Sequence, residues 1–288
     1  QIDSAHYYEL YKRVYRAVRR LNEKHQYSLP LGVGGTALCM VMDKPHLWHD
    51  FLQNLANDKD EQRMLDFYSM HDYNENPYRM LYFYNMHQAW IKELGLPDVP
   101  VFVDEYGFTR TTGVWTDNLK NASGVLAAML LCSNLPNFYL MPWCTYHNPA
   151  TQMSFTQFLR LEDGSYASTP NGNAMHMLHL LKENELEAEG DKTNIIATGD
   201  DSGIAVLATN PKDKPSAVDY VLKELPYDRV TITEYLVDSL HNNRLTGPEC
   251  TELRLTNRRN IPVREDKSIE INKVLNNYGF CLWIVEVF

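Results

Sequence analysis

The sequence predicts an α/β protein in two parts, a set of βα units followed by an antiparallel β-sandwich. Helix-like and strand-like patterns alternate through residues 1–188, as is typical of parallel βα units. From 189 to 288 short apolar or alternating runs are separated by turn residues, as is typical of a sandwich. Four strands precede this change, which is half the number in an eight-stranded barrel. We therefore expect 1–188 to form the second half of a (β/α)8 TIM barrel and 189–288 an accessory β-sandwich.

Each element of the first part has a pattern of its own. Apolar residues recur at helical spacing from Tyr7 to Leu21, after an expected N-cap at Ser4. Gly95 is expected to end a long helix that covers 78–94. The other expected helices cover 45–57, 118–132 and 173–184, and the expected strands cover 31–35, 65–70, 100–107 and 138–141.

The second part contains six runs that read as strands. They cover 194–198, 203–209, 217–222, 229–238, 267–271 and 280–287. Turn-forming sequences such as Asn210-Pro211 lie between them. This spacing favours two antiparallel sheets packed face to face.

Composition argues against several classes of function. The chain has 288 residues, a formal net charge of −10 and no long basic run, so no nucleic-acid partner is expected. It has no apolar run of about 18 residues, so no membrane span is expected. Its five cysteines form no C-x-x-C pair, and neither a metal nor an organic cofactor is implied. Cys132 and Cys144 lie in apolar surroundings and are expected to be buried thiols.

The run at 100–107 ends in a carboxylate that is a candidate functional group. A continuous apolar strand bounded by Pro and Gly is typical of a sheet covered on both faces, and carboxyl ends of barrel strands build active sites. Side chains alternate along a strand, so Val101, Val103 and Glu105 should share one side and Asp104 should point the other way. Glu105 is therefore the candidate. A strand-end Glu paired with a Lys or Arg is the structural alternative.

Three further side chains fall at the carboxyl ends of neighbouring strands, namely His71, Tyr73 and Trp143. A carboxylate held by a Tyr hydroxyl, with an aromatic platform for a sugar face, suits glycoside hydrolysis, because its oxocarbenium-like transition state gains from a nearby carboxylate. Each residue also has a structural explanation, since a lone His is more often a satisfied core residue and aromatic side chains often pack a barrel mouth. The hypothesis depends on all four falling at strand ends.

With these residues in place, the chain resembles glycoside hydrolase family 39, within the clan of retaining (β/α)8-barrel enzymes that includes β-xylosidases and α-L-iduronidases. The resemblance covers nearly the whole chain. Its pieces are similar to the fourth barrel helix, the fifth, sixth, seventh and eighth strands, and the accessory sandwich. They lie at 7–22, 31–37, 70–73, 103–106, 142–143, 203–210 and 235–238.

The resemblance implies a role for each candidate. Glu105 would be the catalytic nucleophile, and Tyr73 would orient its carboxylate. His71 would bind a substrate hydroxyl, and Trp143 would form the sugar platform. His147 is a further candidate for substrate binding and, with Arg110, for contact with an acidic sugar, a solvated loop charge being the alternative for both.

Two departures from the family pattern bear on function. Family members carry the general acid/base Glu in an Asn-Glu-Pro segment that ends the fourth strand, and this chain contains no such segment. A retaining enzyme needs two carboxyls about 5 Å apart, so the second must come from elsewhere. The loop at 144–151 also lacks the acidic pair found in xylosidases of the family.

The leading hypothesis is a retaining exo-glycosidase of the β-xylosidase-like family that acts on a plant or microbial oligosaccharide or polysaccharide. Its missing N-terminal barrel half would lie in the same gene product or on a separate chain. Without that half the sheet has two unpaired edges, which promote aggregation, so we expect the chain to need it. A secreted or periplasmic location would suit this role.

Two alternatives stay open. The first is a non-catalytic carbohydrate-binding or scaffold protein derived from the same fold, which the missing acid/base favours. The second is a different hydrolase that uses Asp104 or Asp72.

Overall fold

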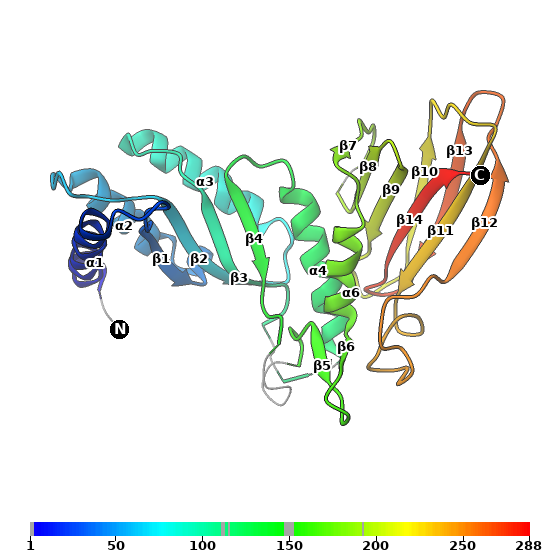
Figure 1. Cartoon of the computed structure of the whole chain (residues 1–288), viewed down its shortest axis with the longest axis horizontal. Coiled ribbons are helices and arrows are strands. Elements are labelled where there is room, and N and C mark those ends of the chain that lie inside the picture. The colour runs from blue at the N-terminus through cyan, green and yellow to red at the C-terminus, as the bar shows by residue number, and fades with distance from the viewer. Residues whose placement is uncertain (1–2, 111–112, 115, 147–152, 192) are drawn as a thin grey trace. The chain divides into compact units, whose positions relative to one another are not determined.

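The structure is a computed structural model that describes residues 3–110, 113–114, 116–146, 153–191 and 193–288. The chain divides into two compact units (Figure 1). Unit 1 comprises Gln1–Asn74, Tyr78–Tyr106 and Cys132–Trp143, and unit 2 comprises Glu75–Pro77, Gly107–Leu131 and Cys144–Phe288. The boundary expected at residue 188 separates the part with alternating helices and strands from the part made of strands. The two compact units are composed of other segments, so this boundary stays a prediction.

Unit 1 is built on a four-stranded sheet with the order β1-β2-β3-β4. Its strands are β1 (Gly34–Cys39), β2 (Phe67–Tyr73), β3 (Val101–Gly107) and β4 (Phe138–Pro142). The β1–β2 and β3–β4 pairs are parallel. Consecutive strands are neighbours and helices connect them, as the alternating sequence pattern predicts. The carboxyl ends of these strands therefore gather at one edge of the sheet.

The α-helices that lie wholly within the described part of unit 1 are α1 (Ser4–His25), α2 (Pro45–Asn57) and α3 (Arg79–Leu94). The bounds of α2 are those expected, and Gly95 ends α3 with φ +63°. The N-cap of α1 is Asp3, not Ser4, because the Asp3 carboxylate accepts the His6 N–H at 2.9 Å and Ser4 already belongs to the helix. A short 3-10 helix, η1 (Val41–Asp43), precedes α2.

The two faces of the sheet differ in their cover. Tyr68 of β2 is fully buried, and its ring contacts Trp48 of α2 and His87 of α3. On the opposite face the Phe67 and Phe102 rings lie 5.5 Å apart, and Phe102 lies 5.4 Å from Tyr139, which is 49% exposed. The helices thus cover one face, and in the described part of unit 1 the other face is partly open.

The first strand begins later than expected, at Gly34 instead of residue 31. A Cβ at Gly34 would collide with the ring of Phe67, its partner across the β1–β2 pair, so close approach of these two strands requires glycine here. Because glycine is depleted in strands, a sequence pattern with several glycines does not show clearly where β1 begins and ends.

Unit 2 contains α4 (Asp117–Cys132), apart from its last residue, which is grouped with unit 1, and α6 (Pro170–His179). A hairpin of β5 (Phe158–Arg160) and β6 (Tyr166–Ser168) lies between them in the chain. α6 begins earlier than expected because Thr169 caps it, its hydroxyl accepting the Gly172 N–H, and Pro170 occupies the first turn.

Two antiparallel sheets make up most of unit 2. One pairs β10 (Ser216–Leu222) with β13 (Ile269–Leu275), and the other has the order β12-β11-β14-β9-β8-β7. The strands of the second sheet are β7 (Asn184–Glu185), β8 (Ile195–Asp200), β9 (Gly203–Thr209), β11 (Arg229–Val237), β12 (Asn257–Pro262) and β14 (Phe280–Val287). The two sheets share one hydrophobic core, in which the Tyr220 ring meets Trp283 at 5.4 Å.

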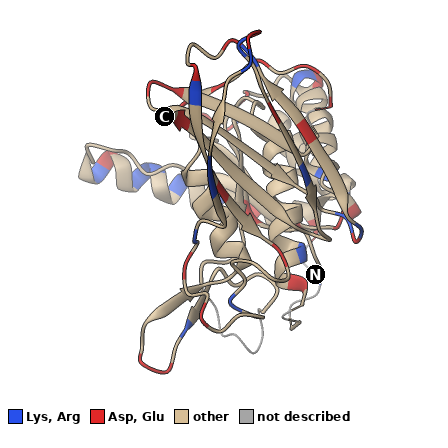
Figure 2. Cartoon of the chain, turned by 90° about the vertical axis from the view of Figure 1, so that its right-hand side faces the viewer, with Lys and Arg blue, Asp and Glu red and all other residues tan. Residues whose placement is uncertain are grey.

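The expected strands of the second part are present with shifts of a few residues, and the mixed α/β class is correct. Sequence patterns missed β12, the edge strand of the larger sheet, because its sequence Asn-Arg-Arg-Asn-Ile-Pro has no apolar run. Charged side chains and proline are common on edge strands, which they protect from pairing with other chains. Figure 2 shows both signs of charge interspersed along the strands of unit 2.

Cys132 and Cys144 are buried, as expected, and form no disulfide within the described residues; burial raises the pKa of the Cys132 thiol to about 12. Among the described residues, no helix has the length and apolar character needed to cross a membrane.

His87 is a buried histidine in the core of unit 1. It is fully buried, and its Nδ1 accepts the Trp48 Nε1–H at 3.3 Å. Burial lowers the pKa of His87 to about 4, because the charged ring would lose its hydration.

We expect His87 to make unit 1 less stable as the pH falls. In an unfolded chain a histidine takes up its proton near pH 6.5, so between pH 6.5 and 4 the unfolded state binds more protons and folding weakens. From pH 7 to pH 5 this loss amounts to about 2 kcal/mol. Urea unfolding of the unsubstituted protein and of His87→Phe at both pH values measures it. The same drop in both proteins would contradict the assignment.

Candidate functional site

The Glu105 carboxylate lies at the end of β3 and contacts two side chains from the end of β2. The Tyr73 hydroxyl donates to Glu105 Oε2 at 2.7 Å. His71 Nδ1 lies 3.3 Å from the same oxygen. The Glu105 side chain is 28% exposed, so it is accessible to a small molecule. Three of the residues predicted from sequence are thus in direct contact.

Asp104 and Glu105 lie on the same side of the sheet, which corrects the expectation that Glu105 shares a side with the buried Val101 and Val103 while Asp104 points the other way. Asp104 Oδ1 lies 3.4 Å from His71 Nε2, and Asp104 Oδ2 accepts the Ser69 hydroxyl at 2.9 Å. The reason is an irregularity in the β3–β4 pairing, where two residues of β3, Asp104 and Glu105, stand opposite Met141 alone. Such a bulge breaks the alternation of side chains and directs both carboxylates to the open face.

Asp72, between His71 and Tyr73, points to the other face and is fully buried. Arg79 of α3 donates to both Asp72 oxygens, from Nε at 2.7 Å and from a terminal nitrogen at 3.2 Å. The same guanidinium reaches Asp43 at 2.6 Å. Asp72 is therefore a structural ion-pair partner, and the hypothesis of a hydrolase that uses Asp72 loses its support.

Two more titratable groups lie near the strand ends. Tyr106 is fully buried, its hydroxyl has no hydrogen-bond partner among the described residues, and burial strongly raises its pKa. Cys39 ends β1 with an exposed side chain, and partial burial of its thiol together with the Glu105 charge raises its pKa. Both groups stay protonated at neutral pH, so neither acts as an anionic nucleophile.

Trp143 follows β4 and is half-buried. Its backbone N–H donates to the Tyr106 carbonyl at 2.9 Å, which places Trp143 beside the end of β3. His147, the remaining candidate, lies outside the described residues. Ser69 and Asp104 are the members of the cluster that sequence reasoning missed, since strict alternation placed Asp104 on the opposite face.

This arrangement can hold a carboxylate in a fixed orientation beside an exposed surface. The Tyr73 hydroxyl, bonded to Oε2 at 2.7 Å with His71 beside the same oxygen, restricts how the carboxyl group can turn. Such preorganisation suits attack by the carboxylate or stabilisation of a developing positive charge. Within the described ranges no group of three or more His, Cys, Asp or Glu side chains has the geometry of a metal site.

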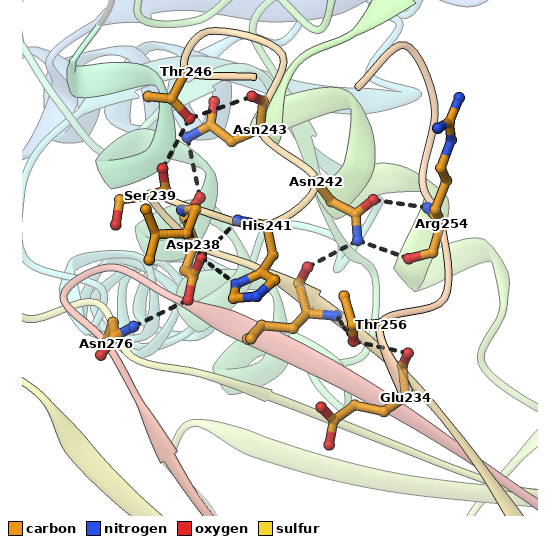
Figure 3. A network of polar contacts seen from close by, with 12 residues as sticks. Glu234, Asp238, Ser239, His241, Asn242, Asn243, Thr246, Arg254, Thr256 and Asn276 are labelled. Carbon is orange, nitrogen blue, oxygen red and sulfur yellow. Dashed lines mark hydrogen bonds and ion pairs between the residues drawn. The ribbon is translucent and has the colours of Figure 1, made fainter. Parts of the chain in front are cut away.

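A second polar network lies in unit 2, around the buried Asp238 (Figure 3). Burial alone would raise the pKa of Asp238, but donors from Leu240, His241 and Asn276 lower it overall. His241 Nδ1 lies 2.9 Å from Asp238 Oδ1, and Asn276 donates to Oδ2 at 3.0 Å. Because most of these contacts lie within the loop that follows β11, the network serves to fix that loop.

Comparison with known proteins supports the resemblance in fold. No protein-family model matches the chain, and no curated protein matches it in sequence. Among solved structures, the family 39 glycoside hydrolase (GH39) from Xanthomonas axonopodis pv. citri is similar, with a TM-score of 0.76 and 16% identity over 99% of this chain. A monomeric β-xylosidase from Caulobacter crescentus has a TM-score of 0.73 at 16% identity over 99% of the chain. A glucosidase from Croceicoccus marinus has 0.72 at 15% identity over 100%.

This chain spans 65%, 66% and 65% of the lengths of those three proteins, respectively. At these identities the likeness shows the fold. The predicted resemblance to glycoside hydrolase family 39 is thus confirmed, and the chain has a GH39-like fold.

We expect the Arg79–Asp72 pair to be a strong determinant of stability. Arg79→Met leaves the fully buried Asp72 carboxylate without its guanidinium partner, and removing one member of a buried pair typically costs about 3 kcal/mol or more. Urea unfolding measures the change. The control is Lys12→Met, which breaks the exposed Lys12–Glu9 pair and should cost less than about 1 kcal/mol. Equal effects of the two substitutions would refute the assignment.

Proposed function

We propose that this chain is the larger part of a retaining glycoside hydrolase in which Glu105 is the catalytic nucleophile. The observation that carries the proposal is the contact of Glu105 Oε2 with both the Tyr73 hydroxyl, at 2.7 Å, and His71, at 3.3 Å. The similarity in fold to a family 39 enzyme and to a β-xylosidase supports the same class of reaction.

The geometry fits the first step of a retaining mechanism. With Oε2 held by Tyr73 and His71, the other oxygen, Oε1, would attack the anomeric carbon and form the glycosyl–enzyme ester. The leaving-group oxygen takes a proton from the general acid, and water then cleaves the ester with the same group acting as base. Tyr73 orients the nucleophile in both steps, because its hydroxyl can donate a hydrogen bond to an oxygen of the ester as well as to the free carboxylate.

For the substrate we propose an oligosaccharide or polysaccharide that is cleaved from its end. Trp143 would supply an apolar platform for a sugar face, since its backbone is fixed beside the end of β3. His147 and Arg110 would contact substrate from the loops that follow β4 and β3. Similar structures include a β-xylosidase, a glucosidase and a bacterial orthologue of α-L-iduronidase, so xylosides, glucosides and iduronides are the substrates to test first.

The general acid/base would come from a segment outside this chain that also completes a (β/α)8 barrel. Two features of the sheet in unit 1 support this. β1 and β4 are its edge strands, and the face that carries Phe102 and Tyr139 is partly open. The similar solved proteins are longer, and the chain covers 65% of the first of them. In this proposal β1 to β4 are strands 5 to 8 of the barrel, and the two sheets of unit 2 form its accessory sandwich.

The alternative is a carbohydrate-binding or scaffold protein of the same fold that lacks bond cleavage. It is favoured by the absence of the family's Asn-Glu-Pro segment from these residues. Both functions predict affinity for a saccharide, and only the enzyme turns it over.

We expect Glu105→Gln to lower turnover of an aryl glycoside at least about a hundredfold, because the amide cannot form the ester intermediate. Binding of the saccharide should change little, since the two side chains have the same shape. A 2-fluoro glycoside should add one sugar mass to the peptide that contains Glu105. The control is Glu93→Gln, an exposed change on α3 with the same loss of charge. Near-normal rates in the Glu105 variant would exclude this nucleophile.

We also expect the protein not to exist as a lone chain of 33.4 kDa. Native mass spectrometry of the protein from its source should show either a longer polypeptide or this chain bound to a second one. The additional segment should contain a Glu that abolishes turnover when changed to Gln. A stable species of 33.4 kDa alone would favour the binding function instead.

A further inference from the structure

We propose that one face of α1 binds an amphipathic helix that has acidic side chains along one border and belongs to the segment that completes the barrel. The inference rests on the proposed function for the existence of that segment. It goes beyond it in naming the surface that binds the segment and the chemistry of the helix that fits this surface.

An apolar stripe runs along the solvent side of α1. Its residues Leu10, Val14 and Leu21 are 51%, 44% and 41% exposed. They follow one another at steps of four and seven residues, with the half-buried Ala17 between the last two, so they form one line along the helix. A surface helix normally turns such a stripe towards a neighbour. In the part of the chain that the structure describes, this stripe is left open to solvent.

The stripe is separate from the face by which α1 packs on the rest of unit 1. That face carries Tyr8, Tyr11 and Tyr15, all of them buried. The rings of Tyr8 and Tyr11 lie 5.9 and 5.3 Å from that of Phe51 in α2. The Tyr11 hydroxyl also donates to the Met64 carbonyl at 2.7 Å. Because these contacts already fix α1, the stripe is available to a second neighbour.

Cations border the stripe on the side away from these tyrosines. Arg13 and Arg20 each precede a stripe residue by one position, and neither has an ion-pair or hydrogen-bond partner among the described residues. By contrast, Arg16 on another side of the helix pairs with Asp60. As a whole α1 carries six Lys and Arg side chains against two Glu, although the chain has a formal net charge of −10. The stripe therefore lies in basic surroundings on an acidic protein.

These charges define the chemistry of the partner helix. Arg13 and Arg20 are two helical turns apart, about 10 Å along the axis. A helix packed on the stripe would place its own border residues next to them, and charges at such borders select the partner when two helices pair. Asp or Glu side chains seven residues apart, beside a line of apolar residues, fit this border. Lys or Arg at the same positions would be repelled.

The free edge of the sheet places the barrel-completing segment beside this surface. Tyr7 of α1 donates to the Thr36 carbonyl at 2.9 Å, so α1 lies over β1, which is an edge strand of the described sheet. A strand added to that edge by a further βα unit would bring its helix next to α1. Asn22 makes two hydrogen bonds with the backbone of Leu31, whose side chain is 46% exposed. The exposed apolar surface thus continues from α1 towards β1.

Two other occupants fit the surface less well. A second copy of α1 would bring its own excess of positive charge to the contact, so pairing of two copies is disfavoured by repulsion. An anionic membrane would attract the cations, but the stripe consists of Leu, Val and Ala and lacks the Trp and Phe that favour a membrane interface. A helix with an acidic border satisfies both the apolar residues and the charges.

Zero-length cross-linking in the complete protein, whether it is one polypeptide or two, tests the inference without any need for activity. A carbodiimide couples an amine to a carboxylate that it contacts. The double substitution Arg13→Lys and Arg20→Lys keeps both charges and supplies amines. These should be coupled to Asp or Glu of a peptide outside the 288 residues of this chain. The control is Arg258→Lys, an exposed change on β12, which should give no such product.

Mass spectrometry of the cross-linked peptide reads the chemistry of the partner. We expect acidic residues seven apart beside apolar residues at helical spacing. Products formed only within these 288 residues would overturn the inference. So would coupling between two copies, detected in mixtures of ¹⁵N-labelled and unlabelled protein. Binding of the complete protein to vesicles of phosphatidylcholine and phosphatidylserine, lost in the double substitution Arg13→Glu and Arg20→Glu, would assign the surface to a membrane and would also overturn it.

Amide hydrogen exchange gives a second readout. The double substitution Arg13→Glu and Arg20→Glu should speed exchange in the partner helix about fivefold or more, because two ion pairs are replaced by repulsion. Unchanged exchange would contradict the proposed contact. If coupling is found while Glu105→Gln keeps normal turnover, this inference stands and the proposed nucleophile fails. If turnover depends on Glu105 and no coupling is found, the proposed function stands and this inference fails.

Discussion

The candidate site depends on a local break in the alternation of side chains along β3. Between Val103 and Tyr106 two residues stand opposite one residue of β4, so Asp104 and Glu105 both reach the open face of the sheet. A regular strand would direct one of them towards the helices. Because of the bulge, both carboxylates contact the ring of His71. The two carboxylates repel each other, and hydrogen bonds from β2 stabilise them: Ser69 donates to Asp104 and Tyr73 donates to Glu105.

The parallel sheet also separates structural from functional carboxylates by its two faces. A parallel sheet needs cover on both sides, and in unit 1 the helices cover one of them. On that face Asp72 is fully buried and held by Arg79, since a carboxylate without water requires a cation. On the other face Glu105 keeps 28% exposure and accepts the neutral Tyr73 hydroxyl at 2.7 Å. Acidic residues at the ends of neighbouring strands therefore differ in burial and in hydrogen-bond partners.

In unit 2, buried amide side chains connect segments that are distant in sequence, as the Arg79–Asp43 ion pair does in unit 1. Asn121 is fully buried, and its carbonyl accepts the backbone N–H groups of Phe108 and Thr109 at 2.8 and 3.3 Å. Its amide donates to Asn171 at 2.8 Å. Asn121 begins a glycosylation-type triplet in the sequence, but in this structure both ends of its side chain are committed to internal contacts. The segment that follows β3 is thereby fixed to α4.

The sequence by itself determined the order of elements and the ends of the parallel strands, and so the placement of Glu105, Tyr73 and His71 at the same end of the sheet. Periodicity and the strand-end rule suffice there, because both depend on local spacing and on the fixed polarity of parallel strands. Only the tertiary structure decided the direction of Glu105 and the burial of Asp72. Both depend on strand register and on the position of Arg79, which lie between segments distant in sequence and leave no local pattern.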